Sequence, residues 1–271
     1  MTATSAILNG SPWLVRLGRL GYVAKGTVYI VIGFLATKAA IGAGGRTTDT
    51  RGAIQAIGEA PFGKVALWII LIGLFGYAAW RLTSAVTDAE RRGDEPSSIA
   101  LRIGEAVRGL AYGSLGYWTL KYVRSDRAES GDPAQSLTGR VLDWPAGRWI
   151  VIAVGLGIVG YAFYQIYRAW SGKFLKRFDL SACGSGTRKW VTRTGRFGIA
   201  ARGIVFGMIG LLVVGAGWAY DPSRVGGIRQ SLDALAAQPA GRYIFGAVAV
   251  GLIAFGLFEL ATARYRVMRA S

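Results

Sequence analysis

The chain has 271 residues, of which 52% are hydrophobic and 40 are glycine, and its mean hydropathy is +0.35. Soluble domains of this length are less apolar, so the composition excludes an ordinary soluble fold and favours the membrane class. Histidine is absent and Cys183 is the single cysteine, which excludes an internal disulfide and argues against any haem or transition-metal site. We therefore expect no cofactor and no metal.

Six apolar segments are each long enough to cross the hydrocarbon core of a bilayer, which takes about 20 residues. In chain order they span residues 20–42, 62–86, 103–123, 146–170, 198–220 and 240–263. Charges interrupt the first and third, because only 12 uncharged residues separate Lys25 from Lys38 and Arg108 from Lys121. Tryptophans at or just beyond the segment ends favour a membrane location, since their rings prefer the headgroup boundary. The predicted fold is an all-α polytopic membrane protein with six transmembrane helices.

The six segments form three copies of a two-helix unit, which is the signature of a repeat architecture. We expect repeats at 16–87, 99–171 and 193–266, linkers at 88–98 and 172–192, an N-terminal arm at 1–15 and a tail at 267–271. Two helices per unit give every copy the same orientation in the membrane. The expected arrangement is three parallel helical hairpins around a pseudo-threefold axis.

The first helix of each repeat carries the same short pattern. A basic residue is followed by glycine at Lys25, Arg108 and Arg202, and an aromatic residue follows one turn later at Tyr29, Tyr112 and Phe206. Positions that recur at this spacing lie on one side of a helix, so we expect them to meet the same kind of neighbour in each repeat.

The second half of each repeat is also patterned. A short amphipathic segment is followed by Pro-x-Gly-Lys/Arg, which predicts a proline in the first turn of the second helix. Small residues let helix backbones approach closely in lipid, so we expect the recurring glycines to form helix contacts. These lie at Gly73 and Gly76, Gly157 and Gly160, and Gly251 in the second helices, and at Gly109, Gly113, Gly203 and Gly207 in two first helices.

Taken together, the motifs Gly-Arg-x-Gly-x-x-Ala-Lys/Arg-Gly-x-x-Tyr, Pro-x-Gly-Lys/Arg and Gly-x-x-Gly-Tyr, repeated three times, resemble the bacterial membrane family named domain of unknown function 1206. The resemblance covers about Leu17 to Arg266 and is weakest in the middle copy, where Glu105 stands in place of Tyr22 and Ile199. It implies three tandem two-helix domains in a bacterial inner membrane. It implies no activity.

Charge predicts the orientation of the helices. If the six segments span the membrane, 20 of the 32 Lys and Arg lie on the side of both termini and 12 on the other. Excess Lys and Arg mark cytoplasmic loops, so we expect both termini in the cytoplasm of a bacterial inner (plasma) membrane. The net charge of +17 is spread over loops and matches no nucleic-acid motif, so we expect anionic lipids rather than nucleic acid as partners.

The three basic residues of the first helices are the candidate site, because ionisable groups near hydrocarbon are costly and mark functional positions. In one interpretation their long side chains reach the cytoplasmic headgroups and pair locally, as Arg202 with Glu259 or Arg108 with Glu105. In the other, Lys25, Arg108 and Arg202 converge near the axis and hold an anion or a lipid headgroup, with Tyr29, Tyr112 and Phe206 lining the next layer.

Two classes of function follow from these features. No catalytic or nucleotide-binding motif is visible, so we expect no enzyme. The first class is an accessory or scaffold component of a membrane assembly, or a lipid-organising protein, with another membrane complex as a partner. The alternative is a transporter or channel that binds an anion or anionic lipid at the basic ring.

Overall fold

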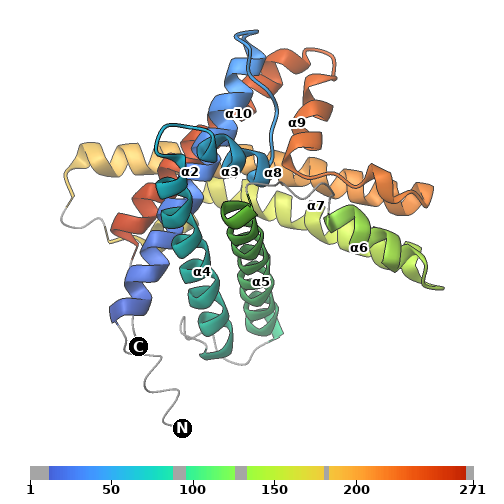
Figure 1. Ribbon diagram of the computed structural model, residues 1–271, viewed down its shortest axis with the longest axis horizontal. Helices are drawn as coiled ribbons and strands as arrows, with labels where there is room; N and C mark the ends of the chain where they lie inside the picture. The colour runs from blue at the N-terminus through green and yellow to red at the C-terminus, as the bar shows by residue number, and fades with distance from the viewer. Residues whose placement is uncertain (1–11, 88–95, 126–132, 180–182, 267–271) are drawn as a thin grey trace.

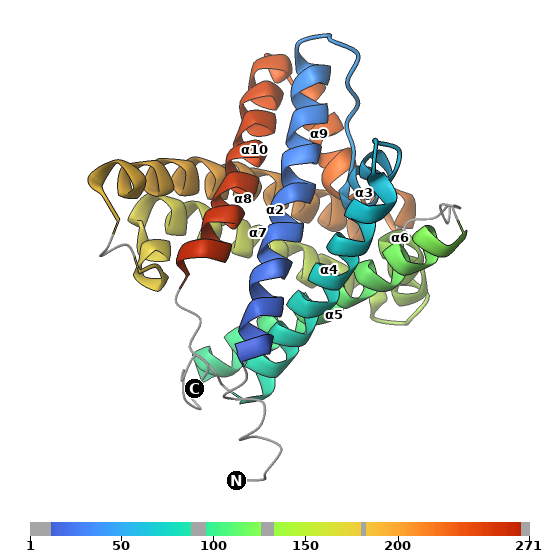
Figure 2. The same ribbon diagram turned by 60° about the vertical axis from the view of Figure 1, so that its left-hand side comes forward.

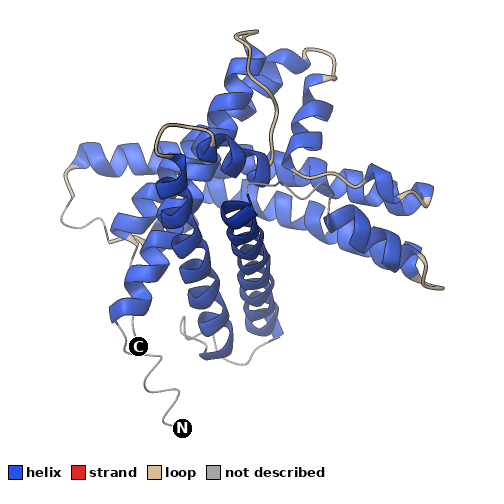
Figure 3. Cartoon of the chain, in the orientation of Figure 1, coloured by secondary structure: helices blue, strands red, loops and turns tan. Residues whose placement is uncertain are grey.

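The computed structural model describes residues 12–87, 96–125, 133–179 and 183–266. Within these ranges the chain folds into helices and loops (Figure 3), and its β pairing is limited to one antiparallel bridge between Phe178 and Arg266. Six helices are long: α2 (Pro12–Ala40), α4 (Gly63–Thr87), α5 (Pro96–Ser125), α7 (Gly147–Ser171), α8 (Ser185–Ala219) and α10 (Gly241–Tyr265). The predicted all-α fold is confirmed.

The connection inside each repeat contains one short helix. These are α3 (Thr50–Gly58), α6 (Pro133–Leu142) and α9 (Ile228–Ala236). These are the amphipathic segments expected from the sequence. Two 3₁₀ helices, η1 (Lys173–Arg177) and η2 (Pro222–Arg224), follow α7 and α8.

Five of the long helices are long and apolar enough to cross a membrane, namely α2, α4, α7, α8 and α10. The length and hydropathy of these helices therefore identify the chain as a membrane protein. Helix α5 is equally long, with 30 residues, but Glu105, Arg108 and Lys121 interrupt its apolar stretch. Five of the six predicted spans are therefore supported by the length and hydropathy of their helices.

Neighbouring repeats pack on one another through their long helices. Helix α4 packs on α5, α7 on α8, and α10 on α2, so each second helix contacts the first helix of another repeat. Figure 2 shows α2 and α10 side by side, and Figure 1 shows α7 and α8 running across them. Within repeats, α2 packs on α4 and α8 on α10. The first and last long helices therefore bring the two ends of the described chain together.

The α2–α10 contact is close because glycines line both helices. A Cβ added at Gly33 would lie 2.7 Å from the Ala249 carbonyl oxygen, and one at Gly256 would lie 2.6 Å from the Gly26 carbonyl oxygen. Backbones at this separation leave no room for a side chain, which is the packing mode expected in lipid. Between the glycines, side chains such as Ile32 are fully buried.

The glycines predicted to form helix contacts behave as expected except in α7, the second helix of the second repeat. An added Cβ would touch a neighbouring helix at Gly73, Gly76, Gly109, Gly113, Gly203, Gly207 and Gly251, as expected. At Gly157 and Gly160 it would meet nothing within 4 Å, so the prediction is wrong there. The reason is that α7 packs on α8 through another face, which contains Gly155. A Cβ added at Gly155 would lie 3.0 Å from the Gly210 carbonyl oxygen.

The Pro-x-Gly signature marks a turn and not the first turn of the next helix, which corrects the prediction. Helices α4, α7 and α10 each begin at the glycine, two residues after the proline. An added Cβ at Gly147 would lie 1.7 Å from the Val141 carbonyl oxygen, and one at Gly63 would lie 2.2 Å from that of Gly58. The glycine is required because the end of the preceding short helix crosses directly over it.

The two equivalent positions Gly73 and Gly157 allow a matched test of this packing. We expect Gly73→Ala to lower the free energy of unfolding by about 1–3 kcal/mol, since its methyl group overpacks the α2–α4 contact. Gly157→Ala should be neutral or stabilise by up to about 1 kcal/mol, because alanine favours helix and meets open space. Unfolding in lipid nanodiscs measures both, and a greater loss at Gly157 would contradict the packing described.

Candidate functional site

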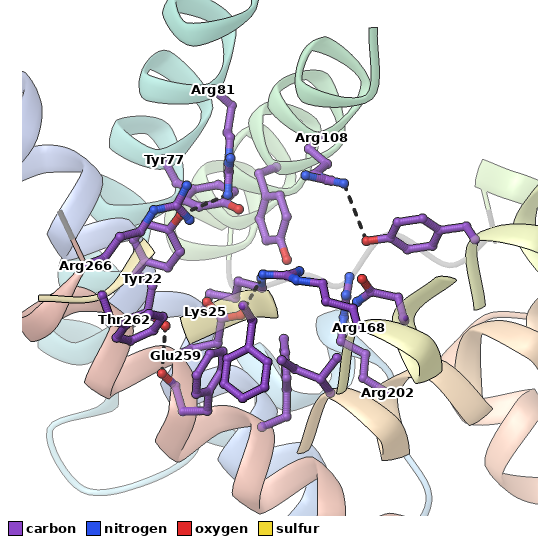
Figure 4. Close-up of a pocket in the computed structure, with 18 residues that line it drawn as sticks. Tyr22, Lys25, Tyr77, Arg81, Arg108, Arg168, Arg202, Glu259, Thr262 and Arg266 are labelled. Atoms are coloured by element: carbon purple, nitrogen blue, oxygen red, sulfur yellow. Dashed lines mark hydrogen bonds and ion pairs between the residues drawn. The ribbon is translucent and has the colours of Figure 1, made fainter. Parts of the chain in front are cut away.

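A cavity of about 80 Å³ lies where the six long helices meet, and every one of them contributes side chains to its wall. One water needs about 10–15 Å³ of such space, so the cavity has room for several waters or a small oxyanion. Basic side chains from five helices and from the end of the described chain point into it (Figure 4). They are Lys25, Arg81, Arg108, Arg168, Arg202 and Arg266.

A buried ion pair joins the first and last long helices at the cavity wall. Lys25 Nζ on α2 donates to Glu259 Oε1 on α10 at 2.9 Å, and their side chains are 9% and 7% exposed. The ammonium also lies 5.1 Å from the centre of the Phe255 ring. Removing two charges from water is expensive, so the pair is stable only because each charge compensates the other.

A second charged cluster joins the first and second repeats. The Arg81 guanidinium on α4 donates to Glu105 Oε2 on α5, and Arg108 Nη1 donates to the other carboxylate oxygen at 3.2 Å. Arg81 also donates to the Tyr22 hydroxyl at 2.9 Å. One carboxylate therefore serves two guanidinium groups, which leaves this cluster with a positive balance.

The third junction, between α7 and α8, holds basic groups without a carboxylate. Arg202 Nε donates to the Tyr29 hydroxyl at 3.3 Å, and its guanidinium lies 4.4 Å from the centre of the Phe206 ring. Across the described residues, no carboxylate lies within ion-pair distance of Arg202 or Arg168. Gln165, which is 2% exposed, also lines the cavity, and its Oε1 has no hydrogen-bond partner in the described part of the chain.

Aromatic rings separate the charged groups. Tyr77 contacts Tyr22 and Tyr112 edge to face, with ring centres 5.3 Å and 4.7 Å apart. Arg108 Nη2 donates to the Tyr161 hydroxyl at 3.5 Å, which is the polar contact that links α5 to α7. Rings and cations within about 6 Å attract each other, so the aromatic wall stabilises positive charge that carboxylates do not neutralise.

The segment after α7 closes one side of the cavity. Phe174 in η1 is 1% exposed and packs edge to face on Phe258, with ring centres 5.3 Å apart. Phe178 follows it and packs on the same ring at 5.4 Å. The Asp179 amide donates to the Tyr265 carbonyl oxygen at 3.0 Å, which fixes the segment to the end of α10.

The predicted site residues are brought together, but with different partners. Lys25, Arg108 and Arg202 all line the cavity, as does Tyr112, whereas Tyr29 and Phe206 lie behind Arg202. The suggested pair of Arg108 with Glu105 is present. The suggested pair of Arg202 with Glu259 is wrong, because Glu259 lies on the α2–α10 junction and binds Lys25.

Of the wall residues on the second helices, Glu259 is expected from the sequence as a charge partner, whereas the others are not assigned to the site there. Aligned on the Gly-x-x-Gly-Tyr motif, Tyr77, Tyr161 and Phe255 are equivalent, and Arg81, Gln165 and Glu259 follow each of them by one turn. All six lie in the cavity wall. The alignment of the repeats could therefore have predicted them as site residues. Arg168 and Arg266 follow no such pattern and were not identified.

Three pairs of long helices, five of them apolar enough to cross a membrane, surround a shared polar cavity and define a helical-repeat membrane protein. The family model for Domain of Unknown Function (DUF1206) matches residues 20–88, 103–172 and 197–266, and the chain belongs to this family. It is 35% identical over 257 residues to "Uncharacterized protein YxxB" of Bacillus subtilis (strain 168), which covers 95% of this chain and 93% of the relative. No solved structure matches.

Breaking the Lys25–Glu259 pair tests its burial. We expect Glu259→Gln to lower the free energy of unfolding by about 3–5 kcal/mol, because it leaves the Lys25 ammonium buried without a counter-charge. The double variant Lys25→Met with Glu259→Gln should recover most of that loss, since neither charge remains. Unfolding in nanodiscs provides the measurement.

The matched control is Arg224→Gln. Arg224 pairs with Asp221 at 3.4 Å, but its side chain is 60% exposed, so its removal should change stability little. Equal losses for Glu259→Gln and the double variant would show that the Lys25 charge is solvated and not buried.

Proposed function

We propose that this protein binds an anionic phosphate-type group in the cavity between its repeats, within a bacterial plasma membrane. The observation that carries the proposal is the charge balance of the wall. Glu105 and Glu259 neutralise only part of the cluster formed by Lys25, Arg81 and Arg108, and Arg168 and Arg202 add two further cations without carboxylates. An uncompensated buried charge is unfavourable, and a bound anion removes that cost.

Arginine suits such a ligand because its planar guanidinium donates two parallel hydrogen bonds to phosphate or carboxylate oxygens. Three arginines from α5, α7 and α8 reach the same cavity. The role we infer is binding without catalysis, since the two carboxylates are held by basic partners and the remaining wall is cationic and aromatic. The source of the phosphate, a lipid headgroup or a free ion, is separated by experiment below.

The depth of the cavity in the membrane fits a headgroup. Lys25 lies 15 residues before the end of α2 at Ala40, which is about 22 Å along a helix. With Ala40 at the outer boundary of a hydrocarbon core of about 30 Å, Lys25 lies in the cytoplasmic third of the membrane. Lipid phosphates lie just beyond that depth, within reach of long basic side chains.

We further propose six membrane spans in a pseudo-threefold ring with both termini in the cytoplasm. The equivalent junctions α4–α5, α7–α8 and α10–α2 support the ring, and Arg108 with Tyr161 continues it between α5 and α7. Arg266 donates to the Tyr22 hydroxyl, so the start of α2 and the end of α10 lie on one side. The five apolar spans already counted support the membrane location.

A second candidate, a scaffold that docks onto another membrane protein, is favoured by the length of α8. Its 35 residues extend about 52 Å, well beyond a hydrocarbon core of about 30 Å. Its first turns, where Arg188, Lys189 and Arg193 are exposed, would project from the membrane and offer a basic surface to an acidic partner or to lipid.

Binding is tested by removing the cations that lack carboxylates. We expect Arg168→Gln with Arg202→Gln to weaken binding of inorganic phosphate to the protein in nanodiscs by at least about tenfold, since charged hydrogen bonds contribute about 1.5–3 kcal/mol each. Arg188→Gln with Arg193→Gln removes the same charge from the exposed part of α8 and should leave the affinity unchanged.

Native mass spectra of both variants, purified from their own membranes, separate the two sources of phosphate. A phospholipid retained by the control and lost by the cavity variant identifies a headgroup site. Phosphate binding without retained lipid identifies a free ion, and flux into proteoliposomes then tests transport. Equal binding by both variants in both assays would refute the proposed function.

Topology is tested with the single cysteine. Cys183 lies in the connection before α8 and is partly exposed, so a membrane-impermeant maleimide should label it only when the cytoplasmic face is accessible. Cys183→Ser with Ala43→Cys moves the thiol to the connection after α2, where Ala43 is exposed, and should reverse the result. Labelling of Cys183 in intact cells would contradict cytoplasmic termini.

A further inference from the structure

Among the described residues, two buried acceptor oxygens on residues of the cavity wall have no hydrogen-bond partner. Glu259 uses Oε1 for Lys25, but its Oε2 is buried and without a hydrogen bond among the described residues. Gln165 Oε1 is also buried and has no hydrogen bond among the described residues. Both residues line the cavity that holds the surplus cations, and both are at least nine-tenths buried, with exposures of 5% and 2%. A buried acceptor left unpaired costs about 1–3 kcal/mol, so each calls for a donor.

The wall contains many N–H groups, but among the described residues none lies within hydrogen-bond distance of either oxygen. Lys25 is already bonded to Glu259 Oε1, and the guanidinium groups of Arg81 and Arg108 are turned to Glu105. Arg202 Nε donates to the Tyr29 hydroxyl, and neither its other N–H groups nor those of Arg168 reach either oxygen. The cavity therefore combines an excess of positive charge with acceptors that need hydrogen atoms. A simple anion satisfies the first requirement and leaves the second unmet.

We propose that the ligand is an oxyanion that carries its own hydrogen-bond donor, and that Gln165 and Glu259 select for it. This inference rests on the proposed function. Phosphate in its protonated forms, a phosphate monoester, or a phosphodiester headgroup with a free hydroxyl meets the description, because each pairs negative oxygens with at least one O–H. Sulfate has the same shape and negative charge, but it carries no hydrogen at neutral pH.

The chemical basis of the selection is an asymmetry between the two parts of the wall. The arginines bind the negative oxygens of either ion. The Glu259 carboxylate attracts an O–H but repels a bare oxygen, and Gln165 Oε1 acts in the same sense with a weaker dipole. Sites that hydrogen-bond a ligand hydroxyl reject analogues without it more strongly than apolar sites reject an extra group, because their polar atoms are left unpaired.

The position of these acceptors within the repeats supports a dedicated role. Arg81, Gln165 and Glu259 occupy equivalent positions one turn after the aromatic residue of each second helix. Arg81 uses its guanidinium on Glu105 and Tyr22. The same position thus provides a donor in the first repeat and acceptors in the other two. A ligand in the cavity meets all three, which gives it a single preferred orientation.

The test compares inorganic phosphate with sulfate on the full-length protein in nanodiscs by calorimetry at one ionic strength. We expect phosphate to bind about 10- to 100-fold more tightly than sulfate, as one or two charged or polar hydrogen bonds would provide. Glycerol phosphate, which adds hydroxyls, should bind at least as well as phosphate if the cavity accepts a headgroup. Equal affinity for phosphate and sulfate would overturn this inference while leaving the anion site intact.

A variant assigns the selection to a residue. Gln165→Leu removes the acceptor at similar volume and should weaken phosphate binding while sulfate binding stays the same or improves. The control, Gln55→Leu on α3, lies outside the cavity wall and should change neither. An equal loss for both ions in Gln165→Leu would show that the amide donates to the anion, which contradicts the inference. Binding of neither ion to the unmodified protein would instead refute the proposed function.

Discussion

The contact between α2 and α10 is the constraint on which the rest of the structure depends. Glycines bring the two backbones together, and the Lys25–Glu259 pair fixes their register at the cavity. The partners are separated by 234 positions in the chain, so this junction joins the third repeat to the first. Because each second helix packs on the first helix of another repeat, a single repeat has no complete cavity wall of its own.

Burial of charge sets the character of the cavity. In a low-dielectric interior an ion pair is stable when its geometry compensates the loss of hydration, and the α2–α10 junction meets that condition. The α7–α8 junction does not, since Gln165 stands where Glu259 stands in the third repeat. Three related junctions thus carry three different balances of charge. The repeats give the three junctions the same arrangement of helices, and substitutions between repeats give each junction its own charge.

Much of the fold could be predicted from the sequence because its determinants are local. Apolar length identified the long helices, and the short amphipathic segments became α3, α6 and α9. Glycine contacts were predicted well at Gly73 and poorly at Gly157, because identical motifs meet different neighbours. Of the site, the periodic residues Lys25, Arg108 and Arg202 could be identified. Glu105 could be predicted as the partner of Arg108, because both lie on one helix. The partners of Lys25 and Arg202 could not, since these contacts form between helices and the alignment of motifs does not specify which helices touch. The start of α8 at Ser185, before its apolar stretch, was likewise not visible from hydropathy.

The contact of Arg266 with α2 has a consequence for the order of the repeats. Arg266 donates to the Tyr22 hydroxyl, and α2 begins at Pro12, so a linker from the end of α10 to the start of α2 could join the chain while it is opened between the first and second repeats. Such a circular permutant would present the repeats in the order second, third, first while keeping every junction between helices. Chains whose ends lie close together commonly tolerate this change. The covalent connection between the first two repeats would then be dispensable, whereas the segment with Phe174 and Phe178 would not, because it forms part of the cavity wall.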